Sequence, residues 1–290
     1  NILAGEAPDL YVSISSEVAP QIREYPRAAT TALNAYTRPI TEPYLTRLSQ
    51  ELEKRGFASR PLIMMSNGGV LGTQTASRFP VRMMESGPAA GALVASYYAE
   101  RLGLDRLLSF DMGGTTAKAC LIEERKPTVT GLFEVDRMYR FKAGSGMPVI
   151  IPAIDMIEIG AGGGSIIQTG HNGRLQVGPQ SAGAEPGPAC YEGGGKEPTL
   201  TDALVHLGYI NPDYLVGGEM PLNADKYRLA LRRKVSESLG RELFEVAHGA
   251  LVVAGATMMR AVKAVTTYRG RDPRDFALFA FGGNGPVVAA

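Results

Sequence analysis

Cysteine and histidine are scarce in this chain of 290 residues, which contains two cysteines and three histidines. Cys120 and Cys190 match no metal-binding spacing and are too few for a disulfide framework, so the sequence predicts two buried thiols in a reducing cytoplasm. His171, His206 and His248 show no spacing typical of a metal site or a catalytic triad. Structural or exposed positions are therefore expected for all three.

The chain also lacks an excess of charge and a long apolar run. Lys and Arg number 30 against 29 Asp and Glu, which gives a net charge of +1. Bulk electrostatics therefore predict neither nucleic acid nor an anionic membrane surface as a partner. Because no uninterrupted run of about 18 apolar residues occurs, no membrane-spanning helix is expected. The first residues also lack the pattern of a secretory signal peptide.

Glycine and proline are abundant, with 35 and 19 residues and no repeat period, which indicates many tight turns. The most informative turn follows an apolar strand at 107–110 and contains Asp111, glycines at 113 and 114, Thr115 and Thr116. An aspartate can hold Mg²⁺, and glycines let backbone N–H groups approach phosphate oxygens where a Cβ would collide. The segment predicts a phosphate-binding turn, with an ordinary hairpin turn as the alternative.

A second glycine turn follows the apolar strand predicted at 276–281. It contains Gly282, Gly283 and Asn284, and bare backbone there would let a flat base and a ribose lie against it. Glycine turns at strand ends are where α/β sheets bind ligands. The two turns together predict a nucleotide site, and two purely structural turns remain the alternative.

The order of strands, helices and glycine turns predicts an α/β layered domain over residues 41–290, preceded by an extended lead-in segment over residues 1–40. Residues 142–200 form a glycine-rich region that we interpret as functional loops. Helices are predicted at 41–55, 86–102, from 223 and at 241–267, and strands at 61–65, 119–122 and 129–133.

Two carboxylates stand just before the glycine run at 160–165. Asp155 is a candidate functional carboxylate and Glu158 a candidate metal ligand, but residues three apart on a strand lie on opposite faces, so a joint site requires a local turn. Hydrogen bonds to nearby loop N–H groups are the alternative for both. Asp202 follows Thr199, and capping of a helix that starts there is the preferred interpretation.

Seven motifs in order resemble the hydantoinase A and 5-oxoprolinase family. They are SNGG at 66–69, ESGPAAG at 85–91, DMGGTT at 111–116, IGAGGGS at 159–165, GPQSAGAEPGPAC at 178–190, TLTDA at 199–203 and FGGNGP at 281–286. The resemblance covers nearly the whole chain and implies an actin-like, ribonuclease H-like ATPase lobe with a mixed sheet flanked by helices and a glycine-rich insertion. Only one Asp-x-Gly-Gly-Thr motif occurs, so we expect the second lobe of a longer protein, without the N-terminal lobe and inactive by itself.

The resemblance implies ATP and Mg²⁺ as cofactors, with a second divalent metal left open. Asp111 would be catalytic and act through Mg²⁺, and Asp155 would be a second catalytic carboxylate. The phosphates would contact Gly113, Gly114, Thr115 and Thr116, and the adenosine would contact Gly282, Gly283 and Asn284. Family members often have Asp where this chain has Lys118, and His where it has Ile157 and Val288. Lys118 is therefore either a phosphate contact or a surface lysine.

The activity implied is ATP-dependent hydrolysis of a cyclic amide such as a hydantoin or 5-oxoproline, together with a hydantoinase B-type subunit or domain. The resemblance leaves homo-oligomer formation open. Two alternatives remain: a subunit of an ATP-dependent ketone carboxylase, and a non-catalytic nucleotide-binding module. The substrate, the metal and the stoichiometry do not follow from the sequence.

Overall fold

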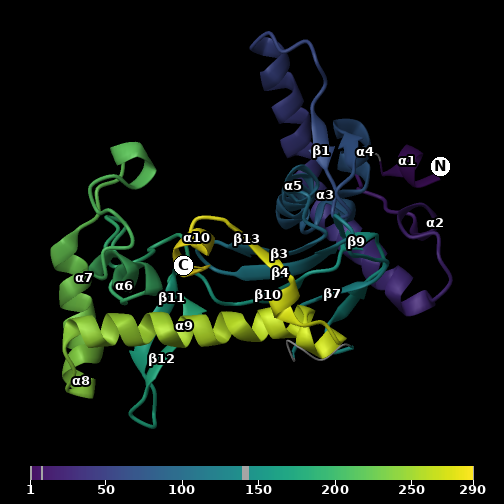
Figure 1. Ribbon diagram of the computed structural model, residues 1–290. Helices are drawn as coiled ribbons and strands as arrows, with labels where there is room; N and C mark the ends of the chain where they lie inside the picture. Colours follow the sequence, from purple (N-terminus) through teal and green to yellow (C-terminus); the bar gives the residue numbers. More distant parts are fainter. Residues whose placement is uncertain (1, 8, 139–143, 290) are drawn as a thin grey trace. The chain divides into compact units, whose positions relative to one another are not determined.

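The structure is a computed structural model that describes residues 2–7, 9–138 and 144–289 (Figure 1). The chain forms two compact units, one of Asn1–Gly103 with Ile122–Asp155 and the other of Leu104–Leu121 with Met156–Ala290. Each unit is considered separately. Residues 142 and 143 of the predicted glycine-rich region lie outside the described residues.

The first unit is built around one long helix. Its elements are α1 (Ile2–Glu6), α2 (Ser15–Val18), α3 (Glu24–Lys54), β1 (Leu62–Met64), β2 (Val70–Gly72), α4 (Thr73–Arg78), the 3-10 helix η1 (Pro80–Met83), α5 (Ser86–Leu102), β5 (Lys126–Pro127), β6 (Val129–Thr130), β7 (Phe133–Val135), β8 (Met147–Val149) and β9 (Ala153–Ile154). The predicted strand at 61–65 and helix at 86–102 are confirmed. The predicted strand at 129–133 is instead split at Gly131 between β6 and β7.

Helix α3 corrects the prediction of an extended conformation for residues 1–40. It begins at Glu24 rather than near 41 and continues through Pro39 and Pro43. A proline inside a helix removes a hydrogen bond, so tertiary contacts must compensate for it. The buried Asn34 supplies such contacts, because its Nδ2 donates to the Arg78 carbonyl at 3.1 Å and its Oδ1 accepts from the Val81 N–H at 3.3 Å.

The second unit contains a mixed sheet and several helices. Its elements are β3 (Arg106–Met112), most of β4 (Ala117–Glu123), β10 (Ile157–Ile159), β11 (Ser165–Thr169), β12 (Leu175–Ser181), α6 (Leu200–His206), the 3-10 turn η2 (Leu215–Gly218), α7 (Ala224–Leu231), the π-helical turn η3 (Arg232–Ser236), α8 (Glu237–Leu239), α9 (Leu243–Val265), the 3-10 turns η4 (Thr267–Arg269) and η5 (Pro273–Asp275), β13 (Ala277–Phe281) and α10 (Gly285–Ala289). The strand order is β10-β4-β3-β13, in which β13 is parallel to β3 and β10 is antiparallel to β4. The mixed α/β lobe that the sequence predicts is confirmed.

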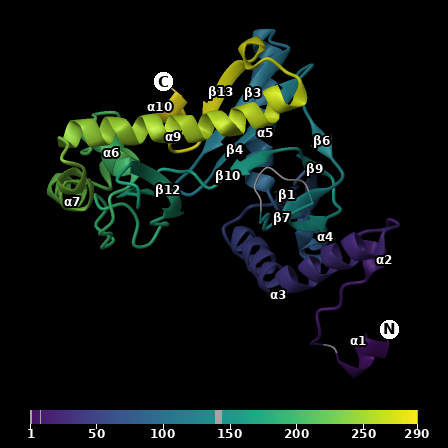
Figure 2. The same cartoon turned by 90° about the horizontal axis from the view of Figure 1, so that it is seen from below.

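Helix α9 runs alongside the sheet in both views (Figures 1 and 2). Its buried residues Ala254, Met258 and Ala261 share one core cluster with Leu108 and Phe110 of β3. The small alanine side chains allow the helix to lie close to the strands. By length and composition alone the helical segment Leu243–Arg269, which begins with α9, is apolar enough to cross a membrane, and a helix packed in a protein core can have the same composition.

The glycine-rich region is less loop-like than the sequence suggests. Strands β8 to β12 lie within residues 142–200, and β11 and β12 form an antiparallel hairpin with a register shift between Ser165 and Ile167. Both cysteines are buried and neither forms a disulfide bond, as predicted. Burial, together with the neighbouring Asp202, raises the pKa of the Cys190 thiol, so this thiol stays protonated.

Candidate functional site

The two glycine turns lie at the same edge of the sheet in the second unit. Strands β3 and β13 are parallel neighbours, and Phe281 at the end of β13 is in register with Asp111 near the end of β3. The two glycine turns therefore follow the carboxyl ends of neighbouring strands and lie side by side. The carboxyl edge of parallel strands is where α/β sheets bind ligands.

The first turn connects β3 to β4 and exposes backbone donors. Its ends are closed by the Gly113 N–H, which donates to the Thr116 carbonyl at 3.0 Å. Gly114 and Thr115 are exposed, and among the described residues their N–H groups donate to no acceptor of the chain. A Cβ added at Gly113 or Gly114 would meet no atom within 4 Å. The turn thus presents free N–H groups next to open space, which suits an anion.

The loop at 162–164 packs against the back of this turn. The Gly163 N–H donates to the Gly113 carbonyl at 3.0 Å, and the Gly164 N–H donates to the Gly114 carbonyl at 2.6 Å. A Cβ at Gly162 would stand 2.5 Å from the carbonyl carbon of Gly114, so no larger residue fits there. Because both carbonyls are fixed from behind, the peptide groups of the turn have a defined orientation.

Thr201 holds the loop at 162–164 in place, a role that the sequence did not predict. Its N–H and its hydroxyl both donate to the Gly163 carbonyl, at 2.7 and 3.0 Å. Thr201 stands at the start of α6, where Thr199 is the N-cap and forms a capping box with Asp202. The only signal in the sequence is the nearness of Thr201 to that predicted cap.

Asn284 of the second turn joins the two turns directly. Its backbone N–H donates to the Met112 carbonyl at 2.9 Å, and its Nδ2 donates to the Gly113 carbonyl at 3.2 Å. The half-buried amide side chain is thus directed at the first turn, whereas the sequence predicts a contact with adenosine. Gly282 and Gly283 are exposed beside it, and a Cβ at Gly283 would meet nothing within 4 Å.

Asp111 is half-buried immediately before the first turn. Burial raises the pKa of its carboxyl above the ordinary value of 3.8, and the positive charge of Lys118 partly opposes that rise. Gly282 approaches this carboxylate so closely that an added Cβ would collide with Oδ1. The carboxylate therefore lies at the junction of the two turns.

Lys118 interacts with both carboxylates that the sequence analysis predicts as metal ligands, Asp111 and Glu158. It is directly opposite Glu158 in the β4–β10 register, and its Nζ is 3.7 Å from Glu158 Oε1. This ion pair disfavours direct metal binding by Glu158, and the described residues contain no group of three or more His, Cys, Asp or Glu that could hold a metal. Asp111 is compatible with Mg²⁺ even without a second protein ligand, because Mg²⁺ is commonly held by one carboxylate together with phosphates and water.

Asp155 belongs to the other unit, where its N–H donates to the Thr128 carbonyl at 2.8 Å. Its predicted catalytic role, like the predicted roles of the other site residues, stays a prediction. Asp202 is different, because the capping interpretation is confirmed. Its fully buried carboxylate accepts the N–H groups of Ala189, Cys190 and Thr199, at 3.1, 2.7 and 2.7 Å.

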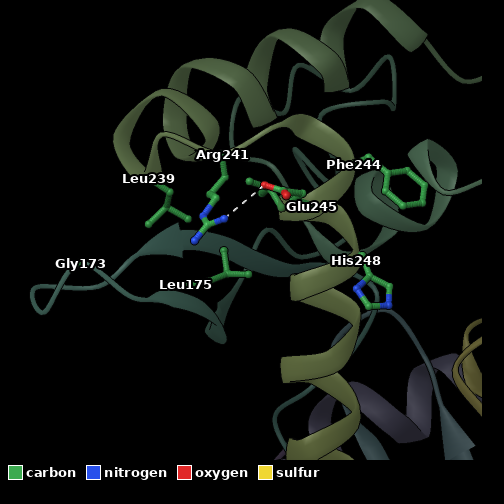
Figure 3. Close-up of a pocket in the computed structure, with 8 residues that line it drawn as sticks. Gly173, Leu175, Leu239, Arg241, Phe244, Glu245 and His248 are labelled. Atoms are coloured by element: carbon green, nitrogen blue, oxygen red, sulfur yellow. Dashed lines mark ion pairs between the residues drawn. The ribbon is translucent and has the colours of Figure 1, made fainter.

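A separate hollow of about 620 Å³ opens at the beginning of α9 (Figure 3). Arg241 points toward Glu245, at 3.8 Å between Nη1 and Oε2, and Phe244 and His248 project from the next face of the helix. The hollow shares no residue with the glycine turns. It is therefore not part of the site at the sheet edge.

Comparison with known proteins places the chain in a family. Residues 27–290 match the family model described as hydantoinase/oxoprolinase. The chain is 38% identical over 276 residues to the caprolactamase subunit alpha of Pseudomonas jessenii, and 38% identical over 287 residues to the acetophenone carboxylase gamma subunit of Aromatoleum aromaticum. These matches cover 95% and 96% of the chain, but 38% and 37% of the relatives. The chain thus spans less than two fifths of the length of these relatives.

Two solved structures share the fold. A nucleotide-free acetone carboxylase, from work on the mechanism of ATP-dependent acetone carboxylation, gives a TM-score of 0.82 at 26% identity and covers 94% of this chain and 37% of that one. The ATP-dependent caprolactamase from Pseudomonas jessenii gives a TM-score of 0.72 at 35% identity and covers 98% and 40%. A lobe of this fold is thus found in ATP-dependent enzymes. The chain belongs to the hydantoinase/oxoprolinase family.

Proposed function

We propose that this chain supplies the nucleotide-binding lobe of an ATP-dependent enzyme that hydrolyses a cyclic amide. The observation that carries the proposal is the pair of glycine turns at the ends of the parallel strands β3 and β13, with free N–H groups at Gly114 and Thr115. The family and the two ATP-dependent structural neighbours support the nucleotide. The caprolactamase relative is named for a lactam, which is a cyclic amide, and supports the substrate class.

Each part of the site has a distinct role in the proposal. The N–H groups of Gly114 and Thr115 hold phosphate oxygens, and the exposed backbone of Gly282 and Gly283 leaves room for the adenosine. The Asp111 carboxylate holds Mg²⁺, and Asn284 keeps the two turns in register. ATP, when bound, activates the ring carbonyl oxygen of the amide so that water can attack the carbon. Stabilisation by oriented donors of this kind is the main contribution of a protein to phosphoryl transfer.

A ketone carboxylase subunit is the second candidate. The acetophenone carboxylase gamma subunit is as similar to this chain as the caprolactamase subunit is, and the acetone carboxylase structure has the higher TM-score. Activation of a carbonyl oxygen by ATP would serve either reaction. A non-catalytic nucleotide-binding module is the third outcome that an experiment must distinguish.

Partners and compartment belong to the proposal as well. Several relatives are named as subunits, which supports a multi-subunit enzyme. We propose a hydantoinase B-type subunit or domain as the partner, a further ATPase lobe that closes over the nucleotide, and a cytoplasmic location. Closure of two lobes would exclude water from the phosphates, so the chain by itself is expected to turn over little ATP.

The test is ATP hydrolysis by the enzyme at its natural length, assembled with its partner. We expect ATP turnover that a cyclic amide such as 5-oxoproline or a hydantoin increases, and that Asp111→Ala abolishes. Stimulation by a ketone with bicarbonate, and not by any amide, would replace the hydrolase with the carboxylase. No stimulation by either class would favour the non-catalytic module. Turnover that survives Asp111→Ala would remove the proposed nucleotide site.

A further inference from the structure

Ser181, the last residue of β12, lies close to the first glycine turn. The connecting residue is Gly164, where an added Cβ would be 2.9 Å from the Ser181 Oγ and 3.0 Å from the Gly114 carbonyl oxygen. Both oxygens therefore border the space in which a Gly164 side chain would stand. Ser181 is exposed, whereas Gly164 beneath it is buried.

Backbone hydrogen bonds fix Ser181 in this place. Ser181 pairs with Ser165 at the end of the β11–β12 hairpin, and the next N–H, that of Ala182, donates to the Gly164 carbonyl at 2.9 Å. The Gly164 N–H in turn donates to the Gly114 carbonyl at 2.6 Å. One residue, Gly164, thus separates the serine segment from the first glycine turn, and the bonds that place the backbone of the serine segment include the one that orients the turn.

The hydroxyl is also prepared to donate. Its oxygen accepts the N–H of Gly183 at 3.1 Å. A serine hydroxyl has one proton to give and two lone pairs, so an accepted N–H leaves the proton for another acceptor. An exposed hydroxyl that is anchored in this way suits an anionic oxygen, because hydrogen bonds to charged acceptors are the stronger ones.

The sheet order indicates which phosphate this would be. The strands run β10-β4-β3-β13, so the turn after β13 is on one side of the β3–β4 turn, and the segment that follows β10 is on the other. Gly282 and Gly283, the proposed place of the adenosine, lie on the β13 side. Ser181 is paired with Ser165, which follows β10 in the chain. A nucleotide that passes from β13 over Gly114 therefore ends toward Ser181.

We propose that the Ser181 hydroxyl donates a hydrogen bond to the terminal phosphoryl group of ATP, a proposal that rests on the nucleotide site proposed above. The Ser181 hydroxyl would make no contact with ADP, because ADP lacks that phosphoryl group. Ser181 therefore makes the site distinguish triphosphate from diphosphate. Ser181 belongs to the motif GPQSAGAEPGPAC at 178–190, and this contact would give that motif a part in nucleotide binding.

The test is calorimetric titration of the enzyme at its natural length, and of its Ser181→Ala and Ser181→Thr variants, with Mg-ADP and with the Mg complex of a non-hydrolysable β,γ-imido analogue of ATP. We expect about tenfold weaker binding of the analogue by Ser181→Ala, the size expected for loss of one hydrogen bond to a charged group. Binding of Mg-ADP and the melting temperature should not change. Ser181→Thr keeps the hydroxyl and should restore binding of the analogue. Ser238→Ala, at an exposed serine of α8, is the matched control.

The outcomes separate this proposal from the one on which it rests. Equal weakening of both nucleotides by Ser181→Ala would mean that the serine only shapes the loop, and unchanged binding of both would mean that it touches neither. Either result overturns the role of Ser181 and leaves the nucleotide site standing. If the unmodified natural-length enzyme binds neither nucleotide, or if its Asp111→Ala variant binds both as well as the unmodified enzyme does, the nucleotide site is wrong and the Ser181 proposal with it.

Discussion

Gly282→Ala is expected to destabilise the second unit strongly, although the residue is exposed. Gly282 has a φ of +83°, and an added Cβ would stand 2.6 Å from the Met112 carbonyl oxygen and would also collide with Asp111 Oδ1. The left-handed conformation costs a non-glycine residue roughly 1–2 kcal/mol. Relief of the steric overlap adds about 1–3 kcal/mol. The free energy of unfolding should therefore fall by about 2–5 kcal/mol.

Gly283→Ala is the matched control for that substitution. Gly283 is the next residue of the same turn, but an added Cβ there meets no atom within 4 Å, and its φ lies outside the left-handed region. Its free energy of unfolding should change by less than about 0.5 kcal/mol. The added methyl group would instead stand on the surface where we propose that the adenosine lies. Gly283→Ala should therefore weaken nucleotide binding and leave stability unchanged.

Scanning calorimetry and urea unfolding of the two variants measure this difference. Gly282→Ala should lower the melting temperature by on the order of 10 °C, whereas Gly283→Ala should melt with the unmodified chain. Equal stability of Gly282→Ala and the unmodified chain would refute the close approach of this turn to β3. Equal destabilisation by both variants would refute the assignment of the crowding to Gly282 alone.

Three further predictions follow from the contacts of the site. Asp111→Asn should stabilise the folded chain at pH 7 while it abolishes Mg-ADP binding, because burial raises the pKa of Asp111 above 3.8 and ionisation therefore destabilises the folded state. Urea unfolding at several pH values should show no gain in stability below pH 3.8 and a gain that grows as pH rises through the raised pKa. A gain that is constant with pH would contradict this. Asp202→Asn should lower the free energy of unfolding by about 2–4 kcal/mol, because the buried carboxylate accepts three N–H groups and the Thr199 hydroxyl. Asp225→Asn, at an exposed residue of α7, should change the free energy of unfolding little. Similar effects of the two substitutions would argue against the capping network. Asn284→Ala should weaken Mg-ADP binding in calorimetry, because the Gly113 carbonyl loses one of the two N–H donors described above. The free energy of unfolding should fall by only about 1 kcal/mol. Unchanged binding would show that the turns keep their register without the amide.

The fold was predictable where local pattern and tertiary context agree. The helix at 86–102, the strand before Asp111 and the strand before Gly282 carry strong periodic or apolar signals, and each occurs where predicted. Helix α3 was missed over its first half, because Pro26 and Pro39 indicate a break and the compensating contacts of Asn34 involve residues more than 40 positions away. Such contacts leave no trace in a window of local sequence.

The site shows the same division. The glycine turns could be found from composition and their position after strands, since glycine is required where a backbone must be approached closely. The contacts behind them could not be found in this way. The donation from Asn284 to Gly113 and from Thr201 to Gly163, and the ion pair of Lys118 with Glu158, depend on register and strand order. The sequence offers the residues but not the pairing.

The most direct test of the account is calorimetric titration of this chain with Mg-ADP, beside Asp111→Ala and with Asp225→Ala as the control on an exposed carboxylate. We expect the unmodified chain and Asp225→Ala to bind with the same affinity and Asp111→Ala not to bind. Binding that Asp111→Ala retains in full would place the nucleotide away from the glycine turns and contradict the central claim.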